Sequence, residues 1–128
     1  MYHLSIAMAR YPDDPDILTD MAVALLDQKR YSAAMPYLER ANRINPNGVP
    51  ALVNLGVGLI GTGQAEKALA PLLRALGLRP EEPMIHLNLA RAYLALGEYE
   101  AARKAYDTLA KLDPKGARAL EPAFFSVW

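Results

Sequence analysis

Apolar and polar residues alternate along the chain with a long, fixed period. The tripeptides INP, LRP and LDP end at Pro46, Pro80 and Pro114, so they recur at one constant interval. Aligned on these prolines, the chain divides into three segments of equal length, 15–48, 49–82 and 83–116. Repetition at such an interval indicates a fold in which similar units stack on one another.

Within each segment, two groups of apolar residues step by three and four positions, which is the spacing of one helix face. In the first segment these groups are Leu18, Met21, Ala22 and Leu25, then Ala34, Leu38 and Ala41. Glycines 63 and 97 lie between the two groups of the later segments, and in each segment a proline that stops a helix follows the second group. The pattern therefore predicts one helix hairpin per segment, whose apolar faces are buried by neighbouring hairpins.

This pattern resembles the tetratricopeptide repeat, which has about 34 residues and the signature W-x2-L-G-x2-Y…A-x3-F…P. The resemblance covers residues 15–116 as three full repeats and implies an all-α, right-handed superhelix of antiparallel hairpins. His86 stands where a large apolar residue is usual, and Leu109 stands where a small one is usual. Since His86 occupies an anchor position, we expect it to be a packed core residue.

The same register continues beyond the three repeats. Residues 1–14 are expected to supply the second helix of an incomplete repeat, and residues 117–128 a short capping helix or tail. Phe124, Phe125 and Trp128 offer more apolar surface than a cap requires, so they are also candidates for self-association.

Composition argues against several functional classes. Fourteen Lys and Arg balance fourteen Asp and Glu, so no net charge favours nucleic acid or an anionic membrane as a partner. The chain has no cysteine, and therefore no disulfide, thiol nucleophile or thiolate metal site. No apolar run approaches the roughly 18–20 residues of a membrane span, and the first residues lack a signal-peptide pattern. We expect a soluble protein, with the cytoplasm slightly favoured.

One stretch imitates a nucleotide-binding motif. Residues 56–63, GVGLIGTG, have the glycine spacing of a dinucleotide-binding turn. In the repeat register, however, Gly56 and Gly58 are helix-packing positions, Gly61 leaves a bare spot in the groove wall, and Gly63 is the turn of a hairpin. The strand that the motif requires is instead the start of a helix. With no paired histidines and no acid–base pair, the sequence predicts no catalytic, cofactor or metal site.

The resemblance implies that the first helix of each repeat lines a concave groove. In this chain the groove residues are Asp20, Val23, Val53, Asn54, Val57, Ile60, Met84, Leu87, Asn88, Arg91 and Leu94. An asparagine amide can pair with both groups of a peptide backbone, so Asn54 and Asn88 either hold a ligand or bond to solvent or within the solenoid. The family's carboxylate clamp finds only one of its five residues, Asn54, in this register.

These observations predict a non-catalytic interaction module that binds an apolar segment of a protein or peptide in the groove. The alternative is a scaffold that assembles with itself as a homo-oligomer, by tail-in-groove contacts or by end-to-end stacking of repeats.

Overall fold

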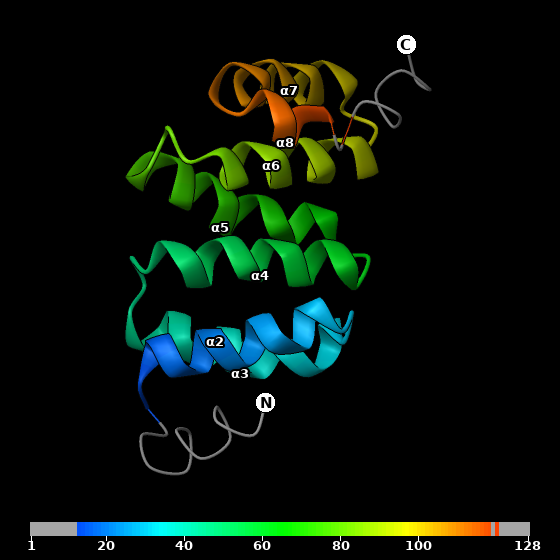
Figure 1. The fold of residues 1–128 in the computed structure, drawn as a ribbon. Helices are drawn as coiled ribbons and strands as arrows, with labels where there is room; N and C mark the ends of the chain where they lie inside the picture. Colours follow the sequence, from blue (N-terminus) through cyan, green and yellow to red (C-terminus); the bar gives the residue numbers. More distant parts are fainter. Residues whose placement is uncertain (1–12, 119, 121–128) are drawn as a thin grey trace.

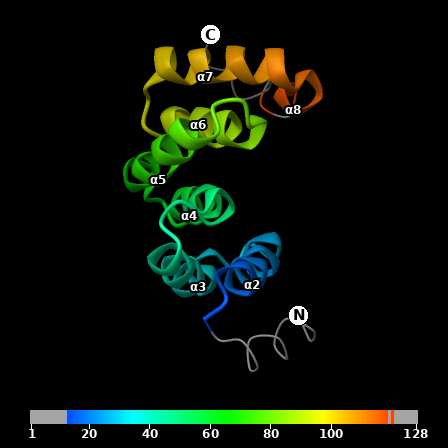
Figure 2. The same cartoon turned by 90° about the vertical axis from the view of Figure 1, so that its left-hand side faces the viewer.

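The computed structural model describes residues 13–118 and 120. Its regular elements in that part of the chain are seven helices: α2 (Pro15–Asp27), α3 (Tyr31–Ile44), α4 (Val49–Gly61), α5 (Ala65–Leu78), α6 (Pro83–Ala95), α7 (Tyr99–Leu112) and α8 (Pro114–Arg118). The helices pair as α2–α3, α4–α5 and α6–α7, and α4 contacts both α2 and α6 (Figure 1). Figure 2 shows the pairs stacked in chain order. The predicted all-α superhelix of helix hairpins is confirmed.

The first helix of each pair begins at the equivalent position of its repeat. These positions are Pro15, Val49 and Pro83, and each helix has proline in one of its first two positions. Proline is tolerated there because the N–H that it lacks would have no partner within the helix. At the start of α2 the Asp14 carboxylate accepts hydrogen bonds from two backbone N–H groups, which caps the helix.

The turn inside each hairpin is built in the same way three times. The N–H groups of the turn residue and of the next residue donate to carbonyls three and five positions earlier, which is a Schellman motif. Gly63 and Gly97 have φ of 78° and 75°, in the left-handed region that glycine adopts without strain. Their predicted role as turns is confirmed. Lys29 holds the equivalent place in the first hairpin, with φ of 59°.

Glycine allows α4 to approach the second helices closely. A Cβ atom on Gly56 would lie 2.6 Å from Cγ of Leu72 on α5, and one on Gly58 would lie 2.6 Å from Sδ of Met35 on α3. The predicted packing roles of Gly56 and Gly58 are confirmed. The prediction for Gly61 is wrong, because a Cβ there would overlap the ring of Tyr31 rather than face an open groove.

Side chains also join the helices to the loops between repeats. Arg74 on α5 donates to the carbonyl oxygen of Pro46 at 3.0 Å and to Oδ1 of Asn47 at 2.6 Å. His86 is 7% exposed, and its Nε2 lies 2.7 Å from the carbonyl oxygen of Pro80, to which it donates. The prediction of a packed core histidine is therefore confirmed.

A short helix, α8, follows the third hairpin. It begins at Pro114, and only Asp113 separates it from the end of α7. Most of the segment expected to form a cap or tail, 117–128, lies outside the described residues. Ala117 and Leu120 are buried against the core, which extends across the last hairpin. The helix expected before residue 13 and the residues Phe124, Phe125 and Trp128 lie outside the described part of the chain.

Candidate functional site

The faces of α2, α4 and α6 that carry the predicted groove residues form what we call the first-helix face. The structure leaves these residues exposed to different degrees. Asp20, Met84 and Arg91 are exposed, Val23, Asn54, Val57, Ile60, Leu87 and Leu94 are half-buried, and Val53 and Asn88 are buried. The face is therefore mainly half-buried and apolar, with an aspartate on α2 and an arginine on α6 reaching solvent.

Three of the predicted residues come together at one hollow of about 320 Å³, which we call the groove hollow. Val53 and Asn54 come from the first half of α4, and Met84 comes from the first turn of α6. The remaining lining residues are Val49, Pro50, Arg79 and Glu82. Residues of α4 thus meet the loop before α6 and the start of that helix, so the hollow exists only because two repeats stack.

The two candidate asparagines differ in what they can offer a ligand. In both, the amide Nδ2 donates to the carbonyl oxygen four positions earlier, Asn54 to Pro50 at 2.8 Å and Asn88 to Met84 at 2.9 Å. The side chain of Asn54 is partly exposed at the groove hollow, so its Oδ1 can accept from an incoming group. Asn88 is 1% exposed, and its buried Oδ1 has no hydrogen-bond partner.

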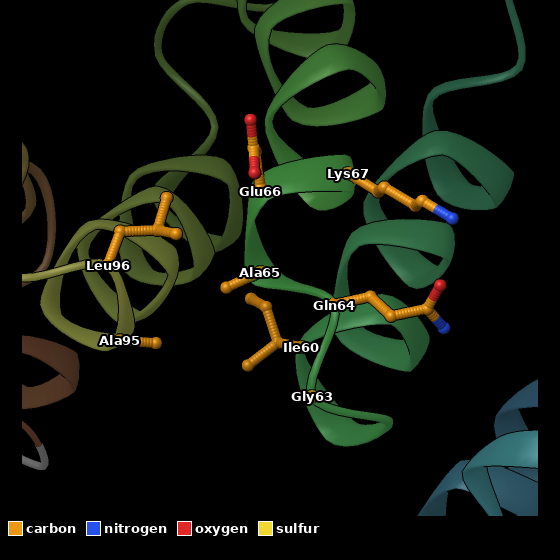
Figure 3. A pocket seen from close by; sticks show the side chains of 8 residues that line it. All are labelled: Ile60, Gly63, Gln64, Ala65, Glu66, Lys67, Ala95 and Leu96. Carbon is orange, nitrogen blue, oxygen red and sulfur yellow. The ribbon is translucent and has the colours of Figure 1, made fainter.

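Ile60 lies at a second hollow of about 490 Å³, where the turns of the second and third hairpins meet. We call it the hairpin-tip hollow, and Figure 3 shows its lining: Ile60, Gly63, Gln64, Ala65, Glu66, Lys67, Ala95 and Leu96. Sequence reasoning missed this hollow. The available signal was Ala65, which occupies the place in its repeat that Tyr31 and Tyr99 occupy in theirs.

Other kinds of site find no support in the described residues. Residues 13–118 and 120 contain no group of three or more His, Asp or Glu side chains placed to hold a metal ion. Within the same residues, no helix is long and apolar enough to cross a bilayer. The groove hollow and the hairpin-tip hollow are the features from which a binding function can be argued.

Family comparisons agree with this architecture. Two sequence profiles described as tetratricopeptide repeat match the chain, one over residues 53–119 and the other over residues 2–55 and 25–76. The chain belongs to the tetratricopeptide repeat family. Tetratricopeptide repeat domains generally mediate protein–protein interaction, and their fold is typically a non-catalytic interaction module.

Individual proteins resemble this tetratricopeptide repeat chain over most of its length. The BBSome complex member BBS4 of Mus musculus is 30% identical over 102 residues, which is 80% of this chain and 20% of BBS4. A structure of MamA from AMB-1 superposes with a TM-score of 0.75 at 29% identity, over 87% of this chain and 66% of that one. The OM64 domain of Arabidopsis has a TM-score of 0.80 at 16% identity, over 89% of this chain and 96% of the domain, which shows the shared fold alone. The chain thus spans about a fifth of the length of the curated relative.

Proposed function

We propose that this tetratricopeptide repeat domain binds an apolar segment of a partner protein along the first-helix face, with one apolar side chain seated in the groove hollow. The observation that carries the proposal is the composition of that hollow. Val53 and Met84 provide apolar walls, and methionine adapts its shape to different side chains. Asn54 adds a hydrogen-bond acceptor beside them. A mainly apolar hollow with a few placed polar groups is typical of a binding site.

The sizes of these contributions are consistent with moderate affinity. Full burial of one apolar side chain contributes about 1.5–3 kcal/mol. A hydrogen bond from a ligand N–H to Asn54 adds about 0.5–1.5 kcal/mol. Contacts with Val57 and Leu87 farther along the face are needed to reach the roughly 8 kcal/mol of a micromolar complex.

Charge gives the ligand a preferred direction. Asp20 on α2 and Arg91 on α6 are exposed at opposite ends of the first-helix face. A bound segment is expected to place a basic residue towards α2 and an acidic residue towards α6. Because both charges are exposed, they contribute to orientation more than to affinity.

Binding can be tested with peptides selected by phage display from a random library, measured by titration calorimetry. Met84 is 47% exposed, so Met84→Glu changes the groove hollow without disturbing the core, and we expect roughly tenfold weaker binding. Asn54→Ala is expected to weaken binding by a smaller factor, about two- to tenfold.

The matched control is Leu73→Glu on α5, because Leu73 is 45% exposed but lies on a second helix, outside the groove hollow. Binding to this variant should equal binding to the unmodified chain. If the selected peptides bind Met84→Glu and Leu73→Glu with equal affinity, the groove hollow is not the binding site. Light scattering at increasing protein concentration tests the alternative of self-assembly, which requires the measured molar mass to increase.

A further inference from the structure

The three repeats differ at the first residue of their second helices. Helices α3, α5 and α7 begin at Tyr31, Ala65 and Tyr99, which occupy equivalent positions of the three repeats. The Tyr31 ring lies against Gly61 at the tip of the next hairpin, so close that a Cβ atom on Gly61 would overlap it. An aromatic ring and a glycine therefore form a matched pair across the joint between the first and second repeats.

The joint between the second and third repeats lacks this ring. Ala65 takes the place of Tyr31, Ala95 takes the place of Gly61, and both line the hairpin-tip hollow. Figure 3 shows Ile60, Ala65, Ala95 and Leu96 around the open space, coming from two successive hairpins. The hollow thus presents apolar walls at the place where the neighbouring joint holds an aromatic side chain.

The first joint also keeps a hollow, of about 420 Å³, beside Tyr31. Lys29, Arg30, Ser32 and Thr62 line it together with Tyr31, Ala33 and Gly61, so apolar surface is a smaller share of its lining than at the hairpin-tip hollow. The hairpin-tip hollow of the second joint is the one that an additional aromatic side chain would complete.

We propose that this side chain is Trp128 of the same molecule, whose indole docks in the hairpin-tip hollow. The segment that follows Leu120 reads EPAFFSVW, an apolar and aromatic stretch outside the described residues. An indole is a rigid ring system of two fused rings, larger than the phenol ring that serves the first joint, and aromatic side chains bury about 150–250 Å² each. This site lies at the hairpin tips, apart from the groove hollow, and does not depend on the proposed function.

The segment is long enough to reach the site. Leu120 is buried in the same core cluster as residues of α6, and α8 contacts α6. Helix α6 has 13 residues and is therefore about 20 Å long, with Ala95 at its end. The stretch 121–128, when extended, spans about 26–29 Å. A tether of this length gives an effective concentration in the millimolar range, which favours the hollow of the same molecule over that of a second copy.

Because Trp128 is the only tryptophan of the chain, its fluorescence reports directly on this contact. With selective excitation of tryptophan in the full chain, we expect blue-shifted emission and weak quenching by acrylamide, both independent of protein concentration. The double variant Ala65→Tyr/Ala95→Gly transplants the ring and glycine of the first joint and fills the hollow. Its emission should shift to the red, and its quenching constant should rise severalfold.

Two further variants keep the test decisive. Leu96 is 37% exposed, so Leu96→Lys alters one wall of the hollow without touching the core, and it should produce the same red shift. Ala70 is exposed on α5 and outside the hollow, so Ala70→Tyr adds a ring without displacing the indole and should leave the emission unchanged.

The proposal is overturned if emission from the unmodified chain is that of a water-exposed indole. It is also overturned if the emission wavelength is unchanged in both the double variant and Leu96→Lys. A blue shift that appears only as concentration rises would place the indole in a second copy and overturn docking within one molecule.

Discussion

Replacing Gly56 and Gly77 by alanine, one at a time, separates helix propensity from packing. Both glycines lie inside helices, Gly56 in α4 and Gly77 in α5. Alanine is favoured over glycine inside a helix by about 0.5–1 kcal/mol. A Cβ on Gly77 meets no atom within 4 Å, so Gly77→Ala should raise the free energy of unfolding by about that amount.

At Gly56 the same gain is opposed by a steric overlap. The new Cβ would lie 2.6 Å from Cγ and Cδ2 of Leu72, whereas carbon atoms in contact are about 3.5–4.0 Å apart. Leu72 is 0% exposed, so it has no solvent to move into, and α4 and α5 must separate by about 1 Å. Overpacking of this kind costs about 1–3 kcal/mol, so the net change for Gly56→Ala is a loss of about 0–2.5 kcal/mol.

Urea unfolding followed by circular dichroism measures both changes, provided that the slope of free energy against denaturant is the same in the three proteins. Gly77→Ala should unfold at a higher urea concentration than the unmodified chain, and Gly56→Ala at a lower one. In melting temperature the two variants should differ by several degrees, at about 3–6 °C per kcal/mol for a chain of this length. If Gly56→Ala is as stable as Gly77→Ala, the close approach of α4 and α5 does not require glycine.

The remaining predictions concern a turn and a joint. Lys29→Gly should stabilise the protein by roughly 0.5–1 kcal/mol in urea unfolding, because the φ of 59° at Lys29 strains any residue with a side chain; a lower unfolding midpoint would contradict this. Gly97→Ala, at the equivalent turn, should lower the stability measured in urea unfolding. Arg74→Ala removes the hydrogen bonds to Pro46 and Asn47 and should accelerate amide hydrogen exchange in the loop between the first two repeats. Because the contact is exposed, the free energy of unfolding should fall by no more than about 1 kcal/mol. Unchanged exchange in that loop would show that the contact does not hold the joint.

The core was largely predictable from sequence, because a helix face is defined by spacing along one chain segment. Leu18, Leu38 and Ala41 were assigned to the core from their register, and all three are 0% exposed. Lys29 was not identified as a turn residue, although it occupies the same place in its repeat as Gly63, which was a usable signal. A lysine does not suggest a turn of this kind, because lysine rarely adopts a left-handed backbone conformation.

The candidate site was only partly predictable. Val53, Asn54 and Met84 do line one hollow, but Ile60 lies at another, and Asn88 is buried. Repeat register assigns the same role to Asn54 and Asn88. Their exposure differs because it depends on which neighbouring elements cover α6, and that information is not contained in the spacing of one helix.

Sequence by itself determined the helix hairpins, their stacking order and the turn at Gly63, because these follow from periodicity and from the conformational preferences of glycine and proline. Tertiary structure alone decided what lies between repeats. The close approach of the Tyr31 ring to Gly61, and the open space beside Ala65, arise where residues of successive hairpins, distant along the chain, meet across a joint. Side-chain volume at such a contact has no periodic signature, so it becomes visible only when neighbouring hairpins are packed together.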